Sequence, residues 1–187
     1  MFDLVQIIYW LALSTWFGGV LFIAVAAPVV MRVMRDEKPV LPRVLSVNLE
    51  GQHGQLLGGA VIGRIMDILF RVELACASAI LVTIVSQLIL LHPSGQFLVL
   101  PIVRVAVYLG AVGLLIYHWR TLWPRMWRVR QEYIDNADNP DVANAALEQL
   151  DRLQGESATV LFLLVTLLLG MIVFSANIRP AIAIPTP

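Results

Sequence analysis

The stretch TWFGGVLFIAVAAP (residues 15–28) places a tryptophan and two adjacent glycines inside a long apolar run. About 20 apolar residues cross the ~30 Å hydrocarbon core of a bilayer, and this run extends over about 3–30. The stretch therefore predicts a membrane-spanning helix. Glycine is among the least helix-favouring residues, so the pair Gly18-Gly19 at mid-depth needs a specific explanation.

The composition of the whole chain agrees with a membrane protein. Of 187 residues, 59% are hydrophobic and only 14% are charged, and the mean hydropathy is +0.80; these values exclude a water-soluble globular domain. Backbone polar groups must be hydrogen-bonded in lipid, and the apolar runs do not alternate as barrel strands would. The predicted fold is all-α: an integral membrane four-helix bundle in one domain over 1–187, with spans at about 3–30, 66–91, 97–119 and 157–178.

An alternative for the first run is a cleaved signal peptide, because Ala24-Val25-Ala26 resembles a processing site. No basic region precedes this run, and it is longer than the usual apolar core of about 7–15 residues. The run is therefore interpreted as a retained span. Cys76 is the only cysteine, which excludes an intramolecular disulfide and a cysteine metal motif.

The basic residues predict how the chain faces the membrane. They gather in or beside two long connections, at about 31–65 and 120–156, whereas the opposite side has the short turn at 93–95 and the two termini. By the positive-inside rule both long connections are cytoplasmic and both termini are outside. The predicted location is the plasma (inner) membrane, with periplasmic termini. The basic residues in or beside the two long connections are Arg32, Arg35, Lys38, Arg43, Arg64, Arg120, Arg125, Arg128, Arg130 and Arg152, and the opposite side has Arg179 in the tail as its basic residue.

The second long connection contains two amphipathic segments. In the first, aromatic and apolar residues recur at helical spacing, which is typical of a helix lying at the headgroup level of the membrane. Asn139 and Pro140 open the second. The two segments are expected to fold back on one another, or on the first connection, as a helical cytoplasmic cap; whether Gly155 breaks the second helix is left open. The predicted lipid-headgroup residues are Trp123, Arg125, Trp127 and Arg128.

The glycines in and near the spans predict close helix contacts. Lipid provides no hydrophobic drive for helices to associate, so small residues that let backbones approach take its place. Such contacts hold together a single bundle, a homo-oligomer or a complex with other membrane subunits, and the pattern does not separate these possibilities. The residues assigned to helix packing or partner contact are Trp16, Gly18, Gly19, Gly59 and Gly63.

Ionisable residues inside spans are costly and indicate a structural or functional role. Asp67 and Arg71, four residues apart, are expected to form a local ion pair. Glu73, Arg104 and His118 are harder to explain. They are interpreted as buried polar contacts between helices, as part of a proton or ion path, or as ligand contacts.

The short turn at 93–95 predicts which of these residues meet. It makes the second and third spans an antiparallel hairpin, in which residues whose numbers sum to roughly 188 are level. Glu73 is then expected to meet His118 or Arg120, and a direct contact with Arg104 is not expected. Arg104 is expected to reach Gln87, Ser86 or a polar group of another helix.

No cofactor is predicted. The three histidines, His53, His92 and His118, fall at different levels and do not form the pair that a bis-histidine haem requires. No cluster has metal-ligand spacing, and no phosphate-binding loop or nucleophile motif is present. Neither catalysis nor nucleic-acid binding is expected.

Three segments together resemble the transmembrane-protein-205-like family, small four-span membrane proteins of unknown biochemical function. They are Trp16-Phe17-Gly18-Gly19 with Ala27-Pro28, Gly59-Ala60-Val61-Ile62-Gly63-Arg64-Ile65, and Arg152-Leu153-Gln154-Gly155-Glu156-Ser157. The resemblance implies histidines at Tyr9 and Gln154 and a proline near Asp67, which this chain lacks. A ligand that such histidines bind in relatives is therefore not expected here, and the same absence weakens a more distant similarity to copper-resistance membrane domains and to the four-span haem protein of porphyrin synthesis.

The sequence favours a non-enzymatic accessory or scaffold protein in a homo-oligomer or a larger membrane complex. The first alternative is a small transporter or channel that uses Glu73, Arg104 and residues 16–19 along a polar path. The second is a haem-binding or metal-binding membrane protein, against which the missing ligands count.

Overall fold

A computed structural model describes residues 2–36, 53–91, 99–136 and 138–176, and these are almost entirely helical. Four helical segments are long and apolar enough to cross a membrane, which confirms the all-α bundle of a multi-pass membrane protein. The elements are α1 (Phe2–Asp36), α2 (His53–Leu91), α3 (Val99–Tyr117), the π-helix η2 (His118–Leu122), α4 (Trp123–Asp135) and α5 (Pro140–Ala176).

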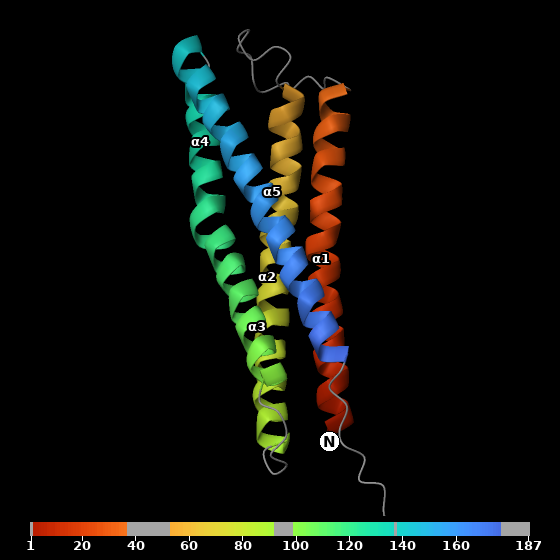
Figure 1. Cartoon of the computed structure of the whole chain (residues 1–187). Helices are drawn as coiled ribbons and strands as arrows, with labels where there is room; N and C mark the ends of the chain where they lie inside the picture. Colours follow the sequence, from red (N-terminus) through yellow and green to blue (C-terminus); the bar gives the residue numbers. More distant parts are fainter. Residues whose placement is uncertain (1, 37–52, 92–98, 137, 177–187) are drawn as a thin grey trace, which may run out of the picture.

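The helices run past the predicted ends of the spans. α1 continues through Pro28 to Asp36, and α2 begins at His53, so both helices extend into the predicted first connection. The turn predicted at 93–95 and His92 lie outside the described residues. We call the end of the bundle where α1 ends and α4 meets α5 the connection end, and the end with the start of α1 and the end of α5 the terminal end (Figure 1).

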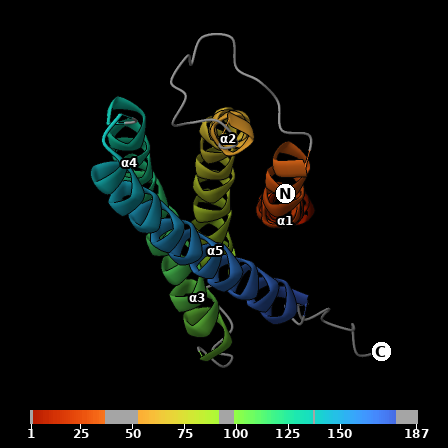
Figure 2. The same cartoon turned by 90° about the horizontal axis from the view of Figure 1, so that it is seen from above.

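The helices pack as two pairs that diverge. α1 lies along α2, and α3 and α4 lie along α5; α1 also contacts α5, whereas α2 and α3 meet only over a short length. α5 crosses the molecule diagonally, so that α4 and the first part of α5 stand apart from α1 and α2 at the connection end (Figures 1 and 2). The bundle is therefore tightest toward the terminal end.

Each helix presents a core face whose residues are spaced alternately by three and four positions. On α1 these residues are Tyr9, Leu13, Trp16, Val20 and Ile23, all at most 1% exposed. This spacing is that of left-handed bundles, in which side chains of one helix fit between those of the next. α1 nevertheless lies at the edge of the bundle. Of its most apolar 18-residue stretch only 11% is buried inside the molecule, whereas 39% of the corresponding stretch of α2 is buried.

The predicted cap exists in a different form. α4 continues α3 through η2 and runs along the bundle (Figure 1), whereas the sequence predicts a separate helix lying across the membrane surface. In η2 the N–H of Trp123 reaches the carbonyl of His118, a wide turn that keeps the helix unbroken. α4 and α5 fold back on one another, one of the two arrangements expected, around a core of Leu122, Val129, Tyr133, Ala143, Ala146, Leu150, Leu153 and Val160.

α5 begins where the sequence predicts a helix start, and it shows whether Gly155 interrupts the helix. Asn139 precedes Pro140, the first residue of α5, and the carbonyl of Asn139 accepts the N–H of Ala143 at 2.9 Å. The helix then continues through Gly155 without a break to Ala176. Gly155 therefore does not separate the cap from the last span.

Candidate functional site

The polar residues in the interior of the bundle occupy core positions of the helix seams. Among the described residues they are Glu73, Thr83, Gln87, Arg104, His118 and Ser175, each at most 5% exposed. On α2, Glu73 follows Met66 and Phe70 in the same alternating spacing as the apolar core. An apolar bundle would place leucine or isoleucine at such positions, so these residues need partners.

His118 joins α5 to the rod formed by α3 and α4. Its Nε2 lies 2.8 Å from the hydroxyl oxygen of Ser157, and its ring meets Phe70 edge-on, with 5.2 Å between the centroids. The numbers 70 and 118 sum to 188, which agrees with the predicted register of the second and third spans. The expected contact between Glu73 and His118 is replaced by the hydrogen bond to Ser157, because α5 covers this side of the histidine.

Glu73 remains without a polar contact. It is 3% exposed, and within the described ranges its carboxyl group has neither a hydrogen bond nor an ion pair. Its expected contact with Arg120 is therefore not made either.

Asp67 pairs with a different partner from the one expected. The indole Nε1 of Trp123 donates to Oδ1 of Asp67 at 3.2 Å, and no ion pair joins Asp67 to Arg71 among the described residues. The Trp123 ring is held from two sides, edge-on to Phe70 at 5.9 Å and to Trp127 at 6.2 Å between centroids. Asp67 thus links α2 to α4.

A second group of polar contacts lies toward the terminal end. The guanidinium carbon of Arg104 is 4.1 Å from the centroid of the Tyr9 ring, and the Tyr9 hydroxyl lies 2.6 Å from that of Ser175. These contacts tie α3 to α1 and α1 to α5. Arg104 therefore contacts a group of another helix, one of the expected alternatives. Gln87 instead donates to Gln6 at 2.8 Å.

Arg104 is satisfied only in part. Its side chain is 5% exposed, and its Nε and Nη2 atoms have no hydrogen-bond partner among the residues that the structure describes. A cation over an aromatic face is attracted by the ring, so Tyr9 compensates for some of the lost hydration. The Oε1 atom of Gln87 is likewise buried without a partner.

The two polar groups are separate. By the register of α2 and α3, Arg104 and Glu73 are roughly 16 Å apart along the bundle. Between them the Tyr108 hydroxyl donates to the carbonyl of Ala77 at 2.9 Å, and Ala77, Ile80 and Ala111 fill the core. The described residues thus form local links between helices and no continuous polar path.

The two glycines of the first span face different surroundings. A Cβ on Gly19 would lie 3.6 Å from Leu69 of α2, whereas a Cβ on Gly18 would meet no atom within 4 Å. Gly19 therefore lies at the seam with α2, and Gly18 lies on the outer side of α1. Trp16 is fully buried in the core, and its indole nitrogen has no hydrogen-bond partner.

Gly59 and Gly63 both face α4. A Cβ on Gly63 would lie 2.9 Å from the ring of Trp127, and one on Gly59 would lie 3.7 Å from Nε of Arg130. These glycines allow the large side chains of α4 to approach the backbone of α2. Both are thus used in contacts within the chain.

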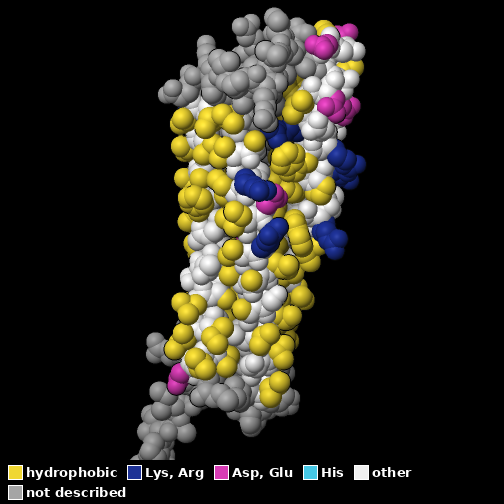
Figure 3. Space-filling view, turned by 180° about the vertical axis from the view of Figure 1, so that it is seen from behind, with side chains coloured by type: hydrophobic (Ala, Val, Ile, Leu, Met, Phe, Trp, Pro, Cys, Tyr) yellow, Lys and Arg dark blue, Asp and Glu magenta, His cyan; other side chains and the backbone are white. Residues whose placement is uncertain are grey.

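The predicted headgroup residues lie in the half of the molecule toward the connection end. Arg125 and Arg128 are exposed, and Trp127 is 39% exposed. Figure 3 shows that charged side chains gather in this half on the face seen from behind. This distribution agrees with the charge segregation in the sequence, and contact of these residues with lipid headgroups stays a prediction.

Sequence reasoning did not identify Ser157 and Ser175 as partners of buried groups. The alternating spacing of three and four residues along the core face of α5 is the signal that could have identified such a residue. Ser175 continues the core series Leu164, Leu168 and Met171 at this spacing. Among the described residues, no three His, Cys, Asp or Glu side chains lie close enough to hold a metal ion. Comparisons with protein-family models, with curated proteins and with solved structures give no match for this chain, so the family resemblance stays a prediction.

Proposed function

We propose that this protein is a non-enzymatic membrane scaffold that assembles with further copies of itself through the outer face of α1. The buried polar residues support a structural role, because most of them tie one helix to another. A transport path through Glu73 and Arg104 receives less support, since an apolar core separates the two residues.

The observation that carries the proposal is the open position of Gly18. It lines a shallow hollow on the outside of α1 with Leu21, Phe22, Val25, Ala26 and Val29. Phe22, 58% exposed, stands between the small residues Gly18 and Ala26. A face with both a ridge and a hollow is self-complementary, as a two-fold symmetric contact requires, and small residues let two such helices approach closely.

The test is the mass of the complex extracted in mild detergent from its native membrane. Gly18→Leu and Gly113→Leu form a matched pair, because a Cβ at either position meets no atom of the described residues within 4 Å. Wild type and Gly113→Leu are expected to migrate as a homo-oligomer and Gly18→Leu as a monomer. A monomeric wild type would refute the proposal. If other polypeptides co-purify in a fixed ratio and Gly18→Leu releases them, the occupant of this face is a partner subunit and not a second copy of the chain.

A further inference from the structure

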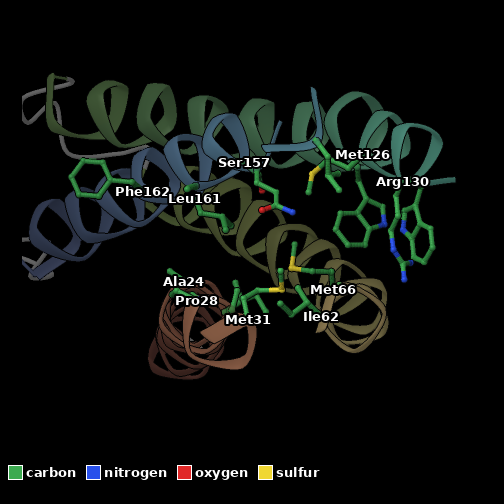
Figure 4. Close-up of a pocket in the computed structure, with 18 of the residues that line it drawn as sticks. Ala24, Pro28, Met31, Ile62, Met66, Met126, Arg130, Ser157, Leu161 and Phe162 are labelled. Atoms are coloured by element: carbon green, nitrogen blue, oxygen red, sulfur yellow. The ribbon is translucent and has the colours of Figure 1, made fainter. Parts of the chain in front are cut away.

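A cavity of about 690 Å³ lies where the two helix pairs diverge, between α1, α2, α4 and α5. Figure 4 shows Met31 of α1, Met66 of α2 and Met126 of α4 among the side chains around it. Methionine is flexible and polarizable, so it adapts to irregular apolar ligands. The volume is within the range of small-molecule binding sites.

The cavity is polar at one end and apolar at the other. Arg130 and Tyr133 line it at the connection end, and Phe162 and Val165 line it deeper in the bundle; Arg130 and Phe162 lie at opposite ends in Figure 4. Its α5 wall runs from Leu147 to Val165, which is roughly 27 Å of helix. This length is more than the ~20–22 Å of one leaflet with its headgroups, so the wall is long enough for a lipid of a single leaflet.

The side of the cavity reaches the outer surface of the bundle. Leu21 of α1 is 43% exposed and Phe162 of α5 is 70% exposed, and both belong to its lining. A molecule from the surrounding lipid can therefore enter between α1 and α5 without unfolding the bundle. The apolar chain of such a molecule would contact Leu21 and Phe162, which are also exposed on the outside of the bundle.

The polar end contains a hydrogen-bond donor that is not used. Tyr133 is 3% exposed, and its buried hydroxyl group has no hydrogen-bond partner in the part of the chain that the structure describes. A buried hydroxyl in this state is costly. Arg130, whose guanidinium carbon lies 4.9 Å from the centroid of the Trp127 ring, places a positive charge in the same wall. Phosphate oxygens fit both groups.

We infer that this cavity binds one phospholipid of the leaflet at the connection end. Its phosphate accepts a hydrogen bond from Tyr133 beside Arg130, and one acyl chain lies between α1 and α5 down to Phe162. The cavity and the hollow at Gly18 share Leu21 but are otherwise lined by different residues, so variants at Tyr133 and Ala158 test lipid binding separately from self-association.

The test measures phospholipid retained by the purified protein. The full chain is reconstituted into vesicles of phosphatidylcholine and phosphatidylglycerol, extracted in mild detergent, passed over a sizing column and analysed by native mass spectrometry and lipid phosphorus. Ala158→Phe adds a ring to the wall of the cavity, and Ala145→Phe adds the same ring to an exposed position of α5 outside it. Wild type and Ala145→Phe are expected to retain one phospholipid and Ala158→Phe none.

A second pair of variants keeps the inference testable if Ala158→Phe does not fold. Tyr133→Phe removes only the buried hydroxyl, whereas Tyr117→Phe removes one that donates to Glu156 outside the cavity. Loss of one hydrogen bond predicts roughly fivefold faster exchange of labelled phospholipid for Tyr133→Phe, and Tyr117→Phe is expected to exchange at the wild-type rate. The inference would be overturned if the purified wild type retained no phospholipid. It would also be overturned if a folded Ala158→Phe retained as much phospholipid as the wild type, or if Tyr133→Phe and Tyr117→Phe exchanged labelled phospholipid at the same rate.

Discussion

Replacing Arg104 by methionine is expected to stabilise the bundle. Two donor atoms of Arg104 are buried without partners, and each such group costs about 1–3 kcal/mol. The contact with the Tyr9 ring at 4.1 Å contributes about 1–2 kcal/mol in the opposite direction. Methionine matches the aliphatic part of the arginine side chain, is shorter and carries no charge; replacement of buried ion pairs by apolar side chains is often neutral or stabilising. The expected net gain is roughly 1–4 kcal/mol.

The assay is reversible unfolding in mixed micelles, with sodium dodecyl sulfate as denaturant and far-ultraviolet circular dichroism as readout. Arg125→Met, on the exposed side of α4, is the control and is expected to change the free energy of unfolding by less than about 0.5 kcal/mol. A destabilised Arg104→Met would refute the reasoning, because it would mean that the guanidinium group has a counter-group in the membrane. A double-mutant cycle with Tyr9→Leu, which removes the aromatic ring, then measures how much of the change passes through Tyr9.

Two further predictions use the same unfolding assay. Gly63→Leu is expected to destabilise the fold by about 1–3 kcal/mol, because its Cβ would lie 2.9 Å from the Trp127 ring, whereas Gly113→Leu is expected to be neutral or slightly stabilising; equal stability of the two variants would contradict this. Ser157→Ala is expected to cost about 1 kcal/mol, because it removes the partner 2.8 Å from His118, and an unchanged midpoint would show that this hydrogen bond is not needed.

Hydropathy was sufficient to predict the all-α membrane fold. The free energy of placing a long apolar run in lipid depends on composition and length, and both can be read along the chain. The register of the second and third spans was also accessible, because helical rise is constant on both sides of a short connection. The contact between Phe70 and His118 agrees with it.

The hydrogen-bond and ring partners of the buried polar groups could not be predicted from hydropathy or from helical rise. Hydropathy gives no information on the order of helices around a bundle, so the sequence pointed to the adjacent span for the partner of His118 and left a polar group of an unspecified helix as one alternative for Arg104. In the structure α5 supplies Ser157 to His118, and α1 supplies Tyr9 to Arg104. The alternating spacing of the core residues identifies the face on which a partner lies, but it does not say which helix faces it.

The glycine pair illustrates the same limit at the scale of one residue. Successive residues on a helix point about 100° apart, so Gly18 and Gly19 belong to different faces although they are neighbours in the chain. Gly19 meets Leu69, and Gly18 is open. Only the position of α2 relative to α1 distinguishes the two roles.

The wide turn at η2 sets the rotational phase between the two helical segments that it joins. A π-helical turn contains one more residue than an α-helical turn, so it rotates everything after it by about 100° relative to an uninterrupted α-helix. Upstream of it, Tyr108 and Leu115 pack in the main core of the bundle; downstream, Val129 and Tyr133 pack in the second core, between α4 and α5. A single-residue deletion within His118–Leu122 is therefore expected to rotate α4 by about 100° relative to α3 and to take Val129 and Tyr133 out of the core that they share with α5.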